Sequence, residues 1–99
     1  MFLVSDAAGE RLLDMLRGVR PKAGQSLRLT QRTPERVGLA LDWEREGDQV
    51  VLCSDRVVLL IEPDLADLLA GTTLVVERGL EGQRLGLRAS PAAAKGAAP

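Results

Sequence analysis

Hydrophobic and polar residues follow their most regular pattern between residues 48 and 76. Residues 50–53 and 57–61 are two apolar runs rich in β-branched residues, and Ser54, Asp55 and Arg56 separate them. Runs of this composition on either side of a short polar segment predict the two strands of a β-hairpin. Residues 72–77 form a third such run and predict a further strand.

A short helix is predicted between that hairpin and the strand at residues 72–77. Pro63 suits the first position of a helix, where its missing N–H needs no partner, and Gly71 suits the end of one. Leu65, Leu68 and Leu69 then fall on one face of the helix.

A longer helix is predicted near the N-terminus, after a short strand at residues 2–4. Ser5 is a suitable N-cap for it, and Pro21 limits it at the other end. Apolar residues recur at helical spacing and predict one buried face, made of Ala8, Leu12, Met15, Leu16 and Val19.

The other segments alternate with the period of half-buried strands. Leu27 and Leu29 alternate with Arg28 and Thr30, which lie on the opposite face of a strand at residues 27–31. Residues 32–36 have the composition of a turn, residues 37–43 alternate again, and residues 84–88 predict a last strand. We therefore expect an α+β fold, a mainly antiparallel β-sheet covered by one longer N-terminal helix and one short helix.

Length and composition indicate one small domain. The chain has 99 residues, of which 45% are hydrophobic and 27% charged, as is ordinary for a globular protein. We expect the domain to span residues 1–90. Residues 91–99 are rich in alanine and proline and contain no large apolar residue, so we expect a flexible tail there.

Charge and residue usage argue against several classes of function. Thirteen basic and fourteen acidic residues are interspersed along the chain, and this balance argues against nucleic-acid binding. No apolar run approaches the roughly 20 residues of a membrane helix, and we expect neither a membrane span nor a signal peptide. The chain has no histidine, and Cys53 is its only cysteine. We therefore expect a cytoplasmic protein without catalytic residues and without enzyme activity.

Several short sequences occur in an order that is typical of one protein family. Residues 4–8 open a helix, residues 27–29 and 38–41 form a strand–loop–strand, and Glu62 with Pro63 opens the short helix. Residues 69–72 add a leucine, a glycine and the start of the next strand. This order resembles HesB/IscA-type (A-type) iron–sulfur cluster carrier domains over residues 4–90. The resemblance implies a HesB-like fold, a place in iron–sulfur cluster biogenesis, and assembly into dimers or tetramers.

The resemblance also implies three cysteine ligands, one in a glycine-rich loop and two in a Cys-Gly-Cys near the C-terminus. Arg32 or Thr33 stands near the first of these positions, and residues 92–96 read Ala-Ala-Ala-Lys-Gly. Because iron clusters need thiolate ligands, we expect neither a bound cofactor nor a metal site. Cys53 falls inside a predicted strand, where it is expected to be a small buried apolar residue. The alternative is a cluster held by Cys53 across a dimer interface.

Partner binding is the remaining kind of site that the sequence suggests. Arg32, Glu35 and Arg36 cluster in the loop that replaces the ligand loop, and they form either a recognition surface or a solvated turn. Trp43 either covers the core or anchors an interface.

We therefore expect a degenerate HesB/IscA-like domain that does not ligate a cluster and binds a protein partner, further copies of itself, or both. Two alternatives remain open at this point. The first is an iron–sulfur or metal carrier that combines Cys53 with non-cysteine ligands. The second is a structural domain that has no connection with iron or sulfur.

Overall fold

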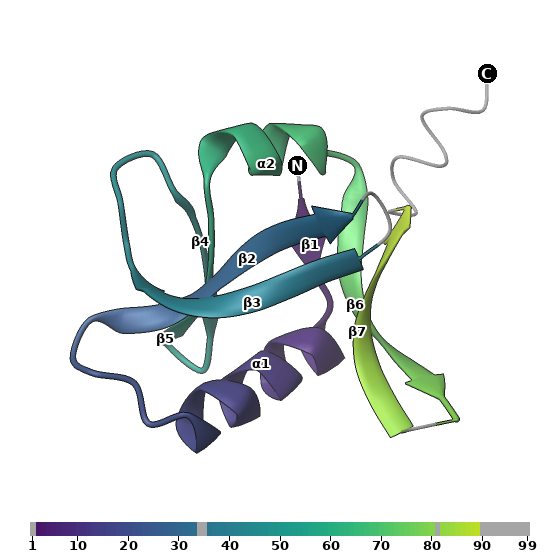
Figure 1. Cartoon of the computed structure of the whole chain (residues 1–99), viewed down its shortest axis with the longest axis horizontal. Coiled ribbons are helices and arrows are strands. Elements are labelled where there is room, and N and C mark those ends of the chain that lie inside the picture. Colours follow the sequence, from purple (N-terminus) through teal and green to yellow (C-terminus); the bar gives the residue numbers. More distant parts are fainter. Residues whose placement is uncertain (1, 34–35, 81, 90–99) are drawn as a thin grey trace.

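Seven strands and two helices form within residues 2–33, 36–80 and 82–89, the parts of the chain that this computed structural model describes (Figure 1). Their bounds in chain order are β1 Leu3–Val4, α1 Asp6–Gly18, β2 Gln25–Thr33, β3 Arg36–Trp43, β4 Gln49–Cys53, β5 Arg56–Ile61, α2 Pro63–Leu68, β6 Thr72–Gly79 and β7 Gly82–Ala89.

The strands divide into two sheets. One has the order β1-β6-β7 and the other the order β3-β2-β5-β4. Only the β1–β6 and β2–β5 pairs are parallel, and the other pairs are antiparallel. Helix α1 packs against β5 of one sheet and β6 of the other, and so joins the two sheets. The predicted α+β class is confirmed, with two mostly antiparallel sheets in place of the single sheet that we expected.

Helix α1 begins where the sequence predicts, and it ends one residue before Val19, the last residue of the apolar pattern. The hydroxyl oxygen of Ser5 accepts a hydrogen bond from the backbone N–H of Ala8 at 3.1 Å, so Ser5 is the N-cap. Ala8, Leu12 and Leu16 are buried, as expected. Val19 was predicted to be buried as well, and this was wrong because its side chain is 51% exposed. Val19 is the C-cap, where the chain leaves the helix and its buried face.

Strands β4 and β5 form the predicted hairpin, and a two-residue turn joins them. Ser54 and Asp55 have φ values of 52° and 63°, the left-handed pair that suits the twist of a tight hairpin. Helix α2 then begins at Pro63, as predicted. Leu65 and Leu69 are buried, but Leu68, which helical spacing places on the same face, is 69% exposed. The short helix turns the Leu65 side toward the core, and Leu68 lies beyond the edge of that face.

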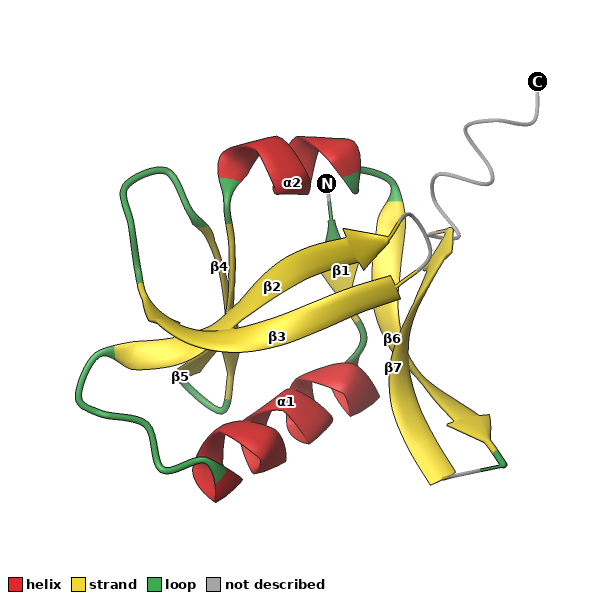
Figure 2. Cartoon of the chain, in the orientation of Figure 1, coloured by secondary structure: helices red, strands yellow, loops and turns green. Residues whose placement is uncertain are grey.

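Strands β2 and β3 extend further toward the connection between them than the turn composition of residues 32–36 predicts (Figure 2). Thr33 lies opposite Arg36 in the antiparallel pairing, so three of the residues expected in the turn belong to strands. Residues 34–35 lie outside the described residues. The tail predicted at residues 91–99 also lies outside them.

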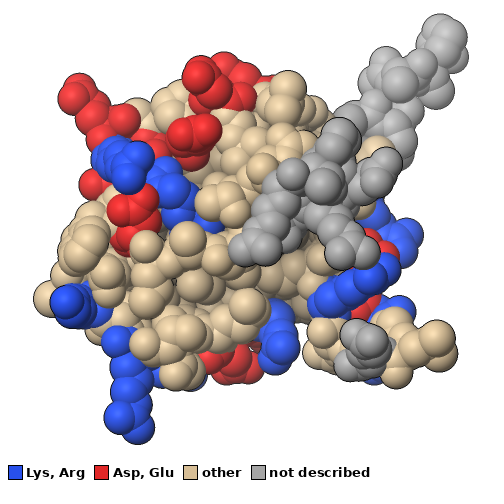
Figure 3. All heavy atoms as spheres, viewed as in Figure 1, with Lys and Arg blue, Asp and Glu red and all other residues tan. Residues whose placement is uncertain are grey.

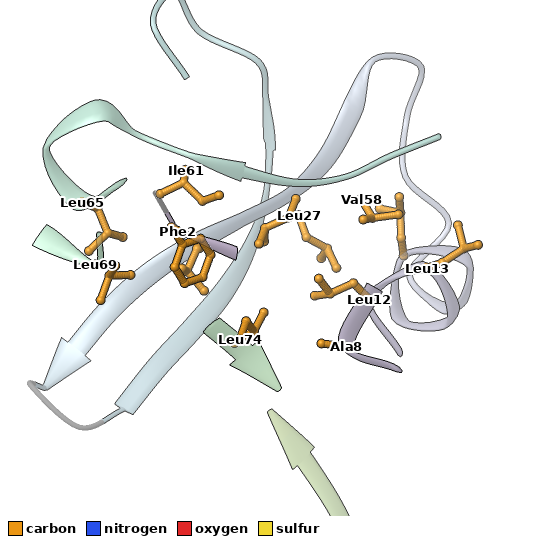
Figure 4. Packing of buried hydrophobic residues seen from close by; sticks show 13 residues of the cluster. Phe2, Ala8, Leu12, Leu13, Leu27, Val58, Ile61, Leu65, Leu69 and Leu74 are labelled. Atoms are coloured by element: carbon orange, nitrogen blue, oxygen red, sulfur yellow. The ribbon is translucent and has the colours of Figure 1, made fainter. Parts of the chain in front are cut away.

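Aliphatic residues from both helices and both sheets meet in one core (Figure 4). Phe2 is its one aromatic member among the described residues, in agreement with a sequence that contains few aromatic residues. The buried cluster comprises Phe2, Ala8, Leu12, Leu13, Leu16, Leu27, Leu29, Val58, Leu59, Ile61, Leu65, Leu69 and Leu74. Neither α1 nor α2, the helices of the described part, is long and apolar enough to cross a membrane.

Candidate functional site

The residues predicted to bind a partner fall at two separate places in the fold. The backbones of Arg32 and Arg36 belong to β2 and β3, near the point where these strands are joined, and Glu35 lies outside the described residues. Trp43 is at the other end of β3. Trp43 lies seven positions after Arg36 in β3, or roughly 23 Å away at the usual rise of a strand. Trp43 therefore does not form one cluster with Arg32 and Arg36.

Trp43 is fixed in position and half exposed. Its side chain is 52% exposed, and its indole N–H donates a hydrogen bond to the carbonyl oxygen of Ala23 at 3.3 Å. The ring lies against Gly24, because a Cβ on that glycine would be 3.4 Å from Cδ1 of Trp43. Trp43 thus covers the loop before β2 and still presents apolar surface to solvent. This combination is common in interface residues.

Arg28 is a feature of the structure that the strand pattern did not predict. Its side chain is buried although Arg28 was placed on the face opposite Leu27 and Leu29. The guanidinium donates from Nε to Asp42 at 2.8 Å, and from Nη1 and Nη2 to the two carboxylate oxygens of Asp48 at 3.0 and 2.6 Å. Nη2 also donates to the carbonyl oxygen of Trp43 at 3.1 Å. The planar fork of arginine matches such a set of acceptors.

A second layer of hydrogen bonds holds the two carboxylates in place. Asp48 accepts a hydrogen bond from the backbone N–H of Arg45 at 2.7 Å, and its side chain is only 1% exposed. Asp42 accepts hydrogen bonds from the backbone N–H of Trp43 at 2.8 Å and from the guanidinium of Arg45 at 2.9 Å. In the described residues no buried side-chain nitrogen or oxygen is left without a partner. Arg28, Asp42, Asp48 and Arg45 are called the Arg28 network below.

The charges of the Arg28 network shift one another's pKa values. Hydrogen bonding from Arg28 lowers the pKa of Asp48, and hydrogen bonding from the Trp43 N–H lowers the pKa of Asp42. The Asp48 hydrogen bond raises the pKa of Arg28, so the guanidinium stays charged. One arginine between two carboxylates leaves the buried centre without a free positive charge. The network therefore fixes β2 to the β3–β4 connection and cannot offer Arg28 to an anionic ligand.

A groove of about 500 Å³ lies beside the Arg28 network, between β2 and α2. Its β2 wall comprises Arg28, Leu29, Thr30 and Gln31, and its α2 wall comprises Glu62, Asp64, Leu65 and Leu68. Glu62, Asp64 and Leu68 are exposed. The groove thus combines an apolar floor with a rim that carries two carboxylates. No local sequence pattern indicates this groove, because it depends on where α2 lies relative to the end of β2.

Cys53 lies on β4, far along the chain from the predicted ligand positions. Its side chain is half buried and packs against α1, where a Cβ on Gly9 would be 3.7 Å from Sγ. The expected packing against the core is therefore observed, with incomplete burial. Within the described ranges no three His, Cys, Asp or Glu side chains are grouped so that they could hold a metal ion. This set of donors does not fit an iron–sulfur cluster, which needs several thiolates.

Comparison with known proteins gives a match in fold and none in sequence. No protein-family model matches the chain, and no curated protein matches it. Among solved structures, Escherichia coli SufA, involved in biosynthesis of iron–sulfur clusters, aligns with a TM-score of 0.63 and 15% sequence identity over 89% of this chain and 84% of SufA. IscA with the [2Fe-2S] cluster aligns with a TM-score of 0.56 and 19% identity over 90% of this chain and 85% of IscA. The chain thus has the fold of SufA and IscA, which confirms the HesB/IscA-like fold expected from the sequence.

Proposed function

We propose that this chain is a HesB/IscA-like protein of iron–sulfur cluster biogenesis that binds other proteins and does not itself ligate a cluster. One observation carries the proposal. The fold aligns with SufA and IscA over about nine-tenths of the chain, while the sequence contains a single cysteine that packs against α1. A protein that keeps the shape without the thiolates retains surfaces for recognition and has lost the means to hold iron.

The position of Cys53 supports this proposal over a carrier function. To reach iron, Sγ would have to leave its contact with α1. Two copies of the chain would still supply two thiolates, whereas common clusters are held by four cysteine ligands. We therefore derive no step through a cluster, and the chemistry that we assign to the chain is recognition of partners without enzyme activity.

Strand β3 supplies the surface that we assign to recognition. It is an edge strand of its sheet, so one row of its backbone N–H and C=O groups is free of strand pairing in the described part. Leu41 and Trp43 project from the same face of β3, two positions apart, and both are exposed. An edge strand with apolar side chains suits a protein partner or a second copy of the chain. Arg32, Glu35 and Arg36 stay in this proposal as contributors at the other end of β3.

The proposed cellular location follows from the single cysteine. A lone thiol without a disulfide partner suits a reducing cytoplasm, where we place the protein. We also keep residues 1–90 as the proposed domain.

Anaerobic reconstitution with ferrous iron and sulfide tests the proposal. The purified chain and IscA are treated in parallel and desalted, and iron and sulfide are then measured per chain together with the visible spectrum. We expect a colourless product without stoichiometric iron, while IscA takes up its cluster. A stable coloured species would contradict the proposal. Loss of the bound iron in the variant Cys53→Ser would then identify that thiol as a ligand.

A further inference from the structure

Strand β2 is paired along one edge and only partly paired along the other. Toward β3 it is paired from Gln25 to Thr33. Toward β5 its pairing is at Arg28, opposite Leu60, and β5 ends one residue later at Ile61. The chain then turns into α2. In the described structure the end of β2 from Thr30 onward therefore has no strand beside it on this edge.

The unpaired edge of β2 opens into the groove between β2 and α2. Thr30 and Gln31 line the groove, and alternate residues of a strand direct their backbone N–H and C=O groups to each edge. Leu29 and Leu65 are buried at its floor, while the exposed Leu68 forms an apolar rim. A partly unpaired strand beside an apolar groove is the setting in which proteins bind an extended peptide by adding a strand to a sheet.

The free charge of the groove is negative. Among the described residues that line it, Arg28 is the one basic residue, and Asp42 and Asp48 already engage that guanidinium. Glu62 and Asp64 form no ion pair with another described residue. Figure 3 shows acidic side chains gathered over α2, at the top of the view. The chemistry of the rim thus favours a ligand that brings positive charge to α2.

We propose that this groove binds an extended segment of a partner protein that alternates aliphatic with lysine or arginine residues. The backbone of the segment pairs with those N–H and C=O groups of β2 beyond Leu29 that face the groove, its basic side chains face Glu62 and Asp64, and an aliphatic side chain lies on Leu68. The proposal rests on the proposed function of protein binding and names the chemistry of the partner. The free part of β2, from Thr30 to Thr33, limits the paired segment to about four residues.

The test is a titration of the ¹⁵N-labelled full chain with the acetylated, amidated hexapeptide Leu-Lys-Val-Arg-Val-Lys, followed by NMR. We expect saturable shifts of Thr30, Gln31 and the amides of α2, and small changes at β7. A peptide with glutamate at its three basic positions should not bind, because the rim of the groove is acidic. Equal binding of both peptides, or shifts centred away from the groove, would overturn the proposal.

Substitutions then test the assignment of the two walls. The double variant Glu62→Gln, Asp64→Asn should weaken binding about fivefold, since two exposed charge pairs are worth about 1 kcal/mol together. Leu68→Ser should weaken it about fivefold by removing the apolar rim. The matched control Glu44→Gln, Glu46→Gln removes two exposed carboxylates from the β3–β4 connection and should change the dissociation constant less than twofold. An equal loss in the control would mean that net charge alone drives binding.

Two further outcomes are informative. The first distinguishes a basic partner segment in the groove from a second copy of the chain. The second separates a failure of the groove assignment from a failure of the proposed function. If the peptide-free chain shows shifts of Thr30 and Gln31 that vary with protein concentration, a second copy occupies the groove and the proposed occupant is wrong. If the reconstituted chain holds a cluster and still binds the basic peptide, the proposed function fails while the groove assignment stands. If the chain takes up no iron and does not bind the basic peptide, the groove assignment fails while the proposed function stands.

Discussion

Arg28 and Asp48 are twenty residues apart in the sequence, and both carboxylate oxygens of Asp48 accept hydrogen bonds from the Arg28 guanidinium. The two residues connect β2 to the segment between β3 and β4. Asp48 comes directly after Gly47, whose φ of 86° lets the chain reverse at that point. The ion pair therefore determines where the β3–β4 connection lies, and with it the position of Trp43 at the end of β3.

Replacing Asp48 should destabilise the fold strongly. In Asp48→Asn the buried guanidinium keeps its charge and loses its main counterion, which costs about 3 kcal/mol for a buried pair. Urea denaturation at pH 7, followed by circular dichroism, measures this change in the free energy of unfolding. The control Asp14→Asn removes a carboxylate from the exposed side of α1. A loss in Asp48→Asn no larger than that of the control would show that the pair does not stabilise the protein.

Stability should fall in acid through the two carboxylates of the Arg28 network. Their pKa values are lowered in the folded chain, whereas an unfolded aspartate titrates near 3.9. Their contribution is therefore complete above about pH 4 and is lost as pH falls through the lowered folded values. Urea midpoints of the wild type and of Asp48→Asn should differ most at neutral pH and converge below pH 4. A difference that stays constant between pH 7 and pH 3 would contradict this origin.

Two glycines should respond in opposite directions to alanine. Gly9→Ala adds a methyl group at ordinary contact distance from Cys53, 3.7 Å from Sγ, and should raise the stability of α1 by about 0.5–1 kcal/mol. Gly24→Ala places a Cβ on a residue with φ of 81° and should lower stability by about 1–2 kcal/mol. Thermal unfolding of both variants checks the pair. If Gly9→Ala is less stable than the wild type, α1 packs too closely on Cys53 to admit the added methyl group.

Trp43 should contribute more to surface recognition than to stability. Trp43→Phe keeps an aromatic ring over Gly24 and loses the hydrogen bond to Ala23, so we expect a loss of about 1 kcal/mol. Circular dichroism during urea unfolding is the suitable measurement, because the variant has no tryptophan. A loss above about 3 kcal/mol would identify Trp43 as a core residue and argue against its role as an interface anchor.

Element positions could be predicted from the sequence because local chemistry determines them. The N-cap at Ser5, the helix start at Pro63 and the β4–β5 hairpin all depend on residues within a few positions of one another. Val19 was assigned wrongly for the same reason. Helical spacing says which residues share a face and does not say where the neighbouring sheet stops.

The Arg28 network could not be predicted from strand alternation, because that pattern treats any charged residue as exposed. Arg28 is buried since two carboxylates from distant positions reach it, and their approach depends on the β2–β3 register. Asp42 lies two residues from Ala40, the partner of Arg28 across the pair, which is a diagonal that long side chains can span. That spacing was the one available signal. The groove beside α2 and the division into two sheets likewise depend on parallel pairings between distant strands.

The pairing of β1 with β6 has a consequence for how the protein is made. Leu3 lies opposite Thr73, seventy positions later, and Val4 lies opposite Leu74 at the centre of the core. During translation β1 therefore cannot pair with β6 until most of the described chain has left the ribosome. Phe2 stays exposed over that interval, since its core neighbours from α2 and β6 come late as well. The β1–β6 pair thus forms only after β6 has emerged, and the nascent chain is most open to aggregation just before that point.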